Sequence, residues 1–266
     1  MTMGRNRLIT LTLILGACVL PGCSMHSVTL PSRITAVHHK PIVLDGNLDD
    51  WQGIAFTQVT PDNGIFDEES YGQGSWRDAD DADDLSFRFA VCHDDEALYI
   101  AVEVTDDHLV TDDTSSKQRT ATAWKDDAVE IFIDGNHNRA PNARDPDGKE
   151  YQSGGEFALV FNGATTSQCS GFAQTFGDAV YWQGATNINA VRESKVTKHI
   201  YEFRFAWSVM GGKVRPGDTI GLTLGVMDDD DGLERDHALF WKAISPCCWR
   251  DESGWGTVFI KPFSGD

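Results

Sequence analysis

The stretch "WKDDAVEIFID", residues 124–134, is the clearest indicator of the fold in this chain of 266 residues. From residue 128 onward its side chains alternate, and one face of the pattern is formed by Val129, Ile131 and Ile133. A period of two residues is typical of a β-strand with one face in a core. The opposite face begins with Glu130, close behind the indole of Trp124. We therefore expect a strand that buries one face and presents a carboxylate on the other.

The same alternation recurs along the chain. Residues 85–104, "LSFRFAVCHDDEALYIAVEV", contain two alternating runs joined by a short acidic turn, which predicts a hairpin. Further strand-like runs are "EFALVF" (156–161), "YEFRFAW" (201–207), "TIGLTLGVM" (219–227), "ALFWKA" (238–243) and "GTVFIKP" (256–262). Many short strands separated by Gly, Asp and Asn turns indicate an all-β fold, an antiparallel β-sandwich.

The N-terminal segment is typical of an exported protein. Residues 1–22 combine two arginines with a short apolar run, which predicts a signal peptide. The segment leads into "LPGC", which resembles the lipobox of bacterial lipoproteins, so we expect lipidation of Cys23; Cys18 is a competing site, and secretion without lipid is the alternative. We expect residues 23–40 to be a tether, residues 41–266 to form the domain, and the protein to be lipid-anchored in the cell envelope.

The charge excludes several classes of partner. The formal net charge is −19, with 41 acidic against 22 basic residues. Such an acidic surface argues against nucleic acid and against anionic lipid, so the lipid anchor is the only membrane contact we expect. The chain contains no G-x-S-x-G, H-E-x-x-H, P-loop or G-x-G-x-x-G motif. We therefore predict a binding protein rather than an enzyme.

Oxygen-rich turns suggest calcium. Asp45, Asn47 and Asp49 alternate in "DGNLDD", and Asp145 and Asp147 lie close together in "DPDGKE". "DDDDG" at 228–232 is a third such turn, although none of the three is a complete EF-hand loop. We predict at least one calcium ion in a structural role, with solvated turns as the alternative.

The cysteines outside the signal segment allow three disulfide pairings. They are Cys92, Cys169, Cys247 and Cys248. Because adjacent cysteines seldom bond to each other, we expect Cys169 to pair with one of Cys247 and Cys248.

Two tryptophans lie beside polar turns rather than inside alternating runs. An indole in the position of Trp124 or Trp249 either closes the rim of a core or forms a stacking platform for a sugar. Sugars present apolar C–H faces surrounded by hydroxyl groups, and carboxylates bind those hydroxyls. Glu130 is close enough in sequence to share a site with Trp124.

Four segments together resemble the carbohydrate-binding module family 9 domain, over roughly residues 41–262. They are "PIVLDGNLDDW" (41–51), "VCHDDEALYIAVEVTDD" (91–107), "WKDDAVEIFID" (124–134) and "CCWRDESGWGTVFI" (247–260). The resemblance implies a β-sandwich with structural calcium, in which a poly- or oligosaccharide lies between Trp124 and Trp249 while Glu130 holds its hydroxyl groups.

The chain departs from the family pattern at the positions that contact sugar hydroxyls. Members that bind sugars carry an arginine and an amide where this chain has Ala158 and Val160. Two further amides would correspond to Gly225 and to a position near Pro246. Either the ligand differs or sugar binding is lost.

Three other functions stay open. Related sandwiches bind haem non-covalently, and Met210, Met227 or a histidine would be the axial ligand. A glycosidase or lyase, or an accessory domain of one, is the second alternative. The third is a purely structural envelope protein.

Overall fold

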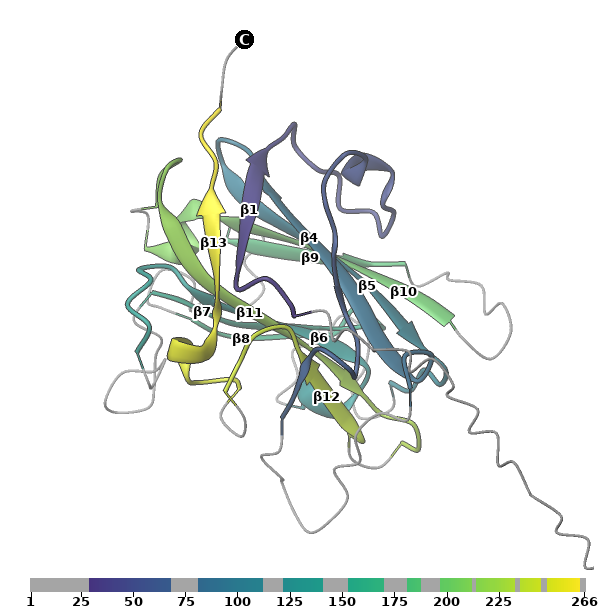
Figure 1. Cartoon of the computed structure of the whole chain (residues 1–266). Coiled ribbons are helices and arrows are strands. Elements are labelled where there is room, and N and C mark those ends of the chain that lie inside the picture. The colour runs from purple at the N-terminus through teal and green to yellow at the C-terminus, as the bar shows by residue number, and fades with distance from the viewer. Residues whose placement is uncertain are drawn as a thin grey trace, which may run out of the picture.

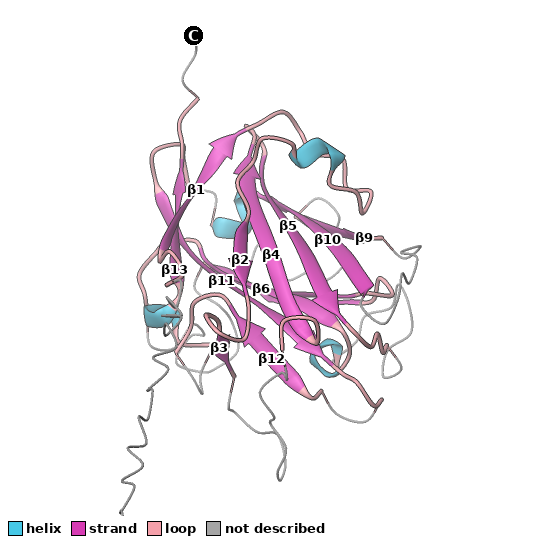
Figure 2. Cartoon of the chain, turned by 45° about the vertical axis from the view of Figure 1, so that its right-hand side comes forward, coloured by secondary structure: helices cyan, strands magenta, loops and turns pink. Residues whose placement is uncertain are grey.

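The computed structural model describes residues 29–67, 81–111, 122–140, 153–169, 181–187, 197–211, 214–232, 235–244 and 248–263. Within these ranges the chain forms β-strands and four short 3₁₀ turns (Figures 1 and 2). The strands are β1 (Arg33–His38), β2 (Thr57–Val59), β3 (Ile65–Phe66), β4 (Leu85–His93), β5 (Ala97–Asp106), β6 (Ala128–Asp134), β7 (Gly154–Val160), β8 (Thr165–Cys169), β9 (Trp182–Thr186), β10 (Thr197–Ala206), β11 (Thr219–Asp228), β12 (His237–Phe240) and β13 (Gly256–Ile260). The 3₁₀ turns are η1 (Asp49–Trp51), η2 (Ala123–Lys125), η3 (Trp207–Met210) and η4 (Glu252–Gly254).

The strands form two layers, as predicted for a sandwich. The first sheet has the order β8-β7-β6-β11-β13-β1, and the second has the order β1-β4-β5-β10-β9. Strand β1 belongs to both, because residues 33–36 pair with β13 and residues 37–38 pair with β4. Both of these pairings are parallel, whereas the other described pairings are antiparallel. Figure 1 shows β1 and β13 running side by side.

The main core lies between the two sheets and confirms the predicted strand faces. Val129, Ile131 and Ile133 of β6 are fully buried in it. The hairpin predicted at 85–104 is formed by β4 and β5. Its inward side chains lie in the same core, namely Phe87, Phe89, Val91, Leu98, Ile100, Val102 and Val104. Burial of apolar side chains on this scale is the main force that holds the layers together.

Residues 41–56 cover the outer face of the second sheet. There Trp51 packs with Tyr99 and the alanines of β4 and β5. Its indole nitrogen donates to Glu202 of β10 at 2.8 Å, and the same carboxylate accepts the backbone N–H groups of Asp45 and Gly46. One buried glutamate therefore fixes the N-terminal segment to the sheet.

The predicted tether is too long at its C-terminal end. Residues 33–38, placed in the tether from the sequence, form β1 and complete both sheets. Without β1, backbone N–H and C=O groups along one edge of β13 and at the end of β4 would lack partners, which gives a physical reason for residues 33–38 to form a strand. Residues 1–28 lie outside the described part of the chain. Within the described ranges, no helix has the length and apolar character needed to span a membrane.

Candidate functional site

Glu130 lies on the outer face of the first sheet, beneath other side chains. It is 4% exposed and stands opposite Ala158 of β7 and Gly225 of β11. A Cβ atom at Gly225 would lie 2.6 Å from the ring of Phe240, so this aromatic ring occupies the space that an amide side chain would need. The departures noticed in the sequence therefore coincide with an apolar surface around the carboxylate.

That surface forms a second hydrophobic cluster, which we call the outer cluster. Its buried members are Ala123, Ala128, Phe132, Ala158, Val160, Ala164, Met227, Ala238, Phe240, Cys248 and Trp255. The face of β6 that begins with Glu130 is therefore not open to solvent along its length. The alternation predicted two different faces correctly, but it did not predict that both would be covered.

Trp124 and Trp249 lie at the margin of the outer cluster, and both are partly exposed. Trp124 belongs to η2, which packs against β6, β7 and β11. Trp249 packs against the outer cluster directly, and the guanidinium carbon of Arg250 lies 5.1 Å from its ring centre. The two tryptophans and Glu130 therefore lie toward one face of the same sheet; that they form one sugar site stays a prediction.

Arg235, which sequence reasoning missed, joins this group from the segment before β12. Its guanidinium carbon lies 5.7 Å from the ring centre of Trp124, and it donates to the sulfur of Met227 at 3.0 Å. It also pairs with Asp67 at 3.4 Å and is 8% exposed. A single arginine in an acidic loop has no periodic or motif signal, so only the fold reveals its position.

Burial raises the pKa of Glu130 from its ordinary value of 4.5 to about 8. The neighbouring Glu156 adds to this rise, Arg235 opposes it, and Asp67 adds a smaller increase. An uncharged carboxyl group can donate one hydrogen bond and still accept another, whereas a carboxylate only accepts. Near neutral pH, Glu130 can therefore donate a hydrogen bond to the oxygen of one hydroxyl group and accept a hydrogen bond from another.

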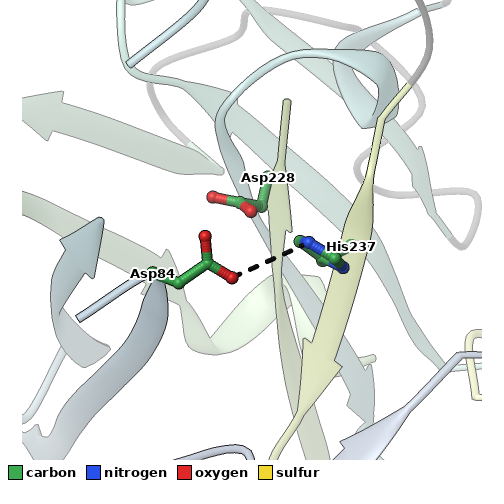
Figure 3. A group of neighbouring side chains, drawn as sticks. All are labelled: Asp84, Asp228 and His237. Carbon is green, nitrogen blue, oxygen red and sulfur yellow. Dashed lines mark ion pairs between the residues drawn. The ribbon is translucent and has the colours of Figure 1, made fainter. Parts of the chain in front are cut away.

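A separate group of carboxylates gathers where β5 and β11 end and β4 begins. Asp84, Asp107 and Asp230 form one triad whose oxygens lie within 4.8 Å of one another, and Asp106, Asp228 and Asp230 form another. Figure 3 shows Asp84 and His237 turned toward each other beside Asp228. Asp84 and His237 form an ion pair in which a carboxylate oxygen lies 3.8 Å from the ring nitrogen Nε2.

Two of these carboxylates are deeply buried and lack a full set of hydrogen bonds from the described residues. Asp228 is 1% exposed, and neither of its oxygens accepts a hydrogen bond from the described residues. Asp106 is equally buried, and one of its oxygens also lacks a hydrogen bond. Burial raises the pKa of Asp106 to about 7 and that of Asp228 well above its usual value, and the carboxylates add to each other's rise. An uncompensated buried charge costs several kcal/mol, so this cluster has the composition and geometry expected of ligands to a hard cation.

Of the predicted calcium turns, residues 228–232 supply Asp228 and Asp230 to that cluster, whereas residues 45–49 are not part of it. At residues 45–49, the side chain of Asp45 accepts the N–H of Asn47, and the side chain of Asn47 bonds both the backbone and the carboxylate of Asp49. These contacts stabilise the turn without a metal, and a cation there stays a prediction. Asp145 and Asp147 lie outside the described residues.

The other predicted side chains have structural surroundings. Met227 lies in the outer cluster and Met210 in the main core, so the two candidate haem ligands lie on opposite faces of the first sheet. Cys92 is a free, buried thiol whose pKa burial raises to about 12. Cys247 and the side chain of Cys169 lie outside the described part, so the expected disulfide stays a prediction.

Comparison with known proteins identifies the family. The model of the carbohydrate family 9 binding domain-like family matches residues 70–262. The chain belongs to this family. Two solved structures of a family 9 module from Caldicellulosiruptor kristjanssonii, one with glucose and one with cellotriose, are each 23% identical to this family 9 domain. The glucose complex has a TM-score of 0.60 over 88% of this chain and 98% of that one; the cellotriose complex has 0.59 over 87% and 95%.

Curated relatives of the family 9 domain are much longer proteins. An exoglucanase of Acetivibrio thermocellus is 24% identical over 233 residues, which is 86% of this chain but 17% of that protein. An endo-1,4-beta-xylanase of Thermoanaerobacterium saccharolyticum is 25% identical over 169 residues, which is 63% of this chain and 12% of that protein. The chain therefore spans less than a fifth of the length of these relatives.

Proposed function

We propose that this family 9 domain is a non-catalytic module that binds an oligosaccharide between Trp124 and Trp249. The observation that carries the proposal is the position of both partly exposed indoles on the sheet face that also holds Glu130 and Arg235. Structural neighbours in complex with glucose and with cellotriose support a ligand of the β-glucan type. The long enzymes that contain a similar segment support a binding rather than a catalytic role.

The chemistry of the site suits a sugar ring. Indole faces stack on the apolar C–H surface of a pyranose, and base or sugar stacking of this kind is worth about 1–3 kcal/mol per ring. Arg235 supplies fixed donors and Glu130 supplies a donor and an acceptor, so the hydroxyl groups would meet both kinds of partner. The apolar surface around Gly225 and Ala158 contributes no hydroxyl contacts, which predicts weaker affinity than a site with the complete set of amides.

Calorimetric titration of the domain with cellotriose and xylotriose tests the proposal. We expect binding of at least one of them, and we expect Trp124→Ala and Trp249→Ala each to weaken it roughly tenfold or more. Trp51→Phe is the matched control, because that indole lies on the other sheet and should leave affinity unchanged. Equal loss of binding in the control, or no binding of any neutral glycan in an array, would contradict the proposal.

We also propose a structural calcium ion at the carboxylates Asp84, Asp106, Asp228 and Asp230. The proposal is supported by the buried, uncompensated oxygens of Asp228 and by oxygen spacings within 4.8 Å. Calcium–oxygen distances are about 2.3–2.6 Å, so ligands around one ion lie up to about 5 Å apart. Such an ion would join the ends of strands from both layers.

Calcium titration of chelator-treated protein tests this second proposal. We expect thermal stability to rise with calcium concentration, because a ligand that binds only the folded state stabilises it. Asp228→Asn should abolish the response, whereas Asp49→Asn, in the exposed turn, should retain it. A melting temperature that is independent of calcium in metal-free wild-type protein would refute the site, and a response to zinc alone would refute the choice of ion.

We further propose that the domain is anchored to the cell envelope through a lipid on Cys23. The support is "LPGC" behind a basic and apolar leader. Intact mass of the protein recovered from its native host should show an acylated Cys23 at the N-terminus. A mature N-terminus downstream of that residue would contradict anchorage and favour secretion.

A further inference from the structure

A cleft lined by basic and hydroxyl-bearing side chains lies beside η4, next to the segment that carries Trp249. Its volume is about 510 Å³. Among the described residues, the basic side chains that line it are Arg33, Arg139 and Lys242. Hydroxyl groups come from Ser32, Thr219 and Thr257, and no carboxylate among the described residues lines the cleft.

The gathering of cations is unexpected on electrostatic grounds. The chain has a net charge of −19, so its lysines and arginines have many acids available as partners. In the described part of the chain, neither Arg33 nor Lys242 forms an ion pair. Arg33 instead lies 5.3 Å over the ring of Phe259, and Arg139 donates to the carbonyl of Ser253. Three basic groups around one concavity repel one another unless an anion lies between them.

The floor of the cleft is held in place by specific contacts. His137 lies between Thr219 and Thr257, with each hydroxyl 3.2 Å from a ring nitrogen. Among the described residues, the non-glycine residues with positive φ are His137 at 51° and Arg139 at 54°. Left-handed backbone at such residues costs on the order of 1 kcal/mol each and is concentrated at functional sites.

Nearby acids do not neutralise the cleft. Asp134 accepts the backbone N–H groups of Asn138 and Arg139 from behind the segment, and it is 1% exposed. Glu252, which is 4% exposed, accepts the backbone N–H of Ala140. Both carboxylates therefore hold the backbone of the segment that presents Arg139.

We infer that this cleft binds the carboxylate of a uronic-acid residue in the glycan held at the two tryptophans. Arginine binds carboxylates through paired N–H donors, and lysine adds a point charge. The hydroxyl-bearing walls suit the remaining oxygens of a sugar ring, and the volume lies within the usual range of about 300–1,000 Å³ for small-ligand sites. The inference rests on the proposed sugar site.

The chain itself connects the two sites. Trp249 packs on the outer cluster, and Gly254 and Trp255, a few residues later, line the cleft. The indole nitrogen of Trp255 donates to the carbonyl of Cys248 at 2.9 Å, which holds both ends of this segment together. A glycan that leaves the Trp249 site along this segment therefore meets the basic groups.

The test compares two xylo-oligosaccharides of equal length, one of which carries a glucuronic acid branch. Calorimetry with the wild-type domain should show about tenfold tighter binding of the acidic one, the size expected for one charge-assisted contact. Lys242→Gln and Arg33→Gln should each remove most of that preference. Lys261→Gln is the matched control, because Lys261 is exposed, lacks an ion pair in the described part of the chain and does not line the cleft. The preference should also fall as sodium chloride is raised, since salt screens exposed charges.

The outcomes separate this inference from the proposed function. Equal affinity for both oligosaccharides, with dependence on Trp124 retained, would overturn the cleft assignment and leave the sugar site standing. Failure of every oligosaccharide to bind would overturn both. A further outcome is that inorganic sulfate at millimolar concentration competes with oligosaccharide binding while the neutral and acidic oligosaccharides bind with equal affinity. The cleft is then a site for simple anions, and the assignment to a uronic acid is wrong.

Discussion

Replacing Glu130 with glutamine should change how the stability of the domain depends on pH. Burial raises the pKa of this carboxyl from 4.5 to about 8, with Glu156 adding to the rise. Between these two pH values the folded protein keeps a proton that the unfolded chain releases. The free energy of unfolding therefore falls as pH rises through this window. Glutamine has no proton to release, so the variant lacks this contribution.

The expected magnitude follows from the shift. At about 1.4 kcal/mol per pH unit, the shift corresponds to a contribution on the order of 5 kcal/mol at most. The wild-type domain and Glu130→Gln should thus have similar stabilities near pH 4.5. By pH 8 the variant should be more stable by several kcal/mol, provided that Arg235 keeps its contact with Asp67.

Urea unfolding of both proteins between pH 4.5 and 8.5 measures the effect. Titrating groups that do not interact with Glu130, including Asp106 and Asp228, contribute equally to both proteins and cancel in the difference. Glu103→Gln is an informative control of opposite sign. Burial raises the pKa of Glu103, but hydrogen bonds to Arg88 and Lys198 outweigh burial and lower it, so this variant should be less stable than the wild type throughout this pH range, and the difference should close only below pH 4.5. A difference between Glu130→Gln and wild type that stays constant with pH would refute the reasoning.

Three further predictions concern stability at fixed pH. Glu202→Gln should destabilise the domain by about 2–4 kcal/mol in urea unfolding, because two buried donors and one part-buried donor would face a group with one acceptor oxygen. An unchanged midpoint would show that the N-terminal segment is not fixed by this residue. Gly154→Ala should cost about 2–4 kcal/mol in the same assay, since φ is +88° and a Cβ atom would lie 2.1 Å from the carbonyl oxygen of Ile133; full stability would mean that the strand can shift. Trp124→Ala and Trp249→Ala should each cost less stability than the roughly 3–5 kcal/mol typical of a buried tryptophan, because both are partly exposed. Thermal unfolding that shows a larger loss, with binding reduced only in proportion, would favour two indoles that merely close the core.

Local periodicity predicted the strands that carry the core. β4, β5, β6, β10 and β11 were expected from alternation, and their buried faces are the ones predicted where residues were assigned. β1 was missed because its sequence, "RITAVH", is short and its partners lie far away, at the start and the end of the domain. Parallel pairing of this kind is decided by long-range topology, which a window of a few residues does not contain.

The candidate site was predictable to the extent that it depends on sequence spacing. Trp124 and Glu130 belong to one continuous motif, and the structure places both on the same sheet face. The carboxylate cluster was predictable only in part: the oxygen-rich turn at 228–232 supplies Asp228 and Asp230, but Asp84 and Asp106 come from the ends of other strands that are distant in sequence. The turn at 45–49 had the more suggestive local spacing, yet its side chains bond to one another.

The departures from the family pattern have a common physical cause. Ala158 and Val160 are both fully buried in the outer cluster, and the ring of Phe240 occupies the space beside Gly225. A polar side chain at any of these positions would now lie in an apolar environment without a partner, at a cost of about 1–3 kcal/mol. Restoring one amide of the family pattern should therefore destabilise the domain rather than improve binding. The polar contacts to a ligand must then come from elsewhere: Arg235 and Lys242 lie in loops and Arg33 is the first residue of β1, and all three can provide them.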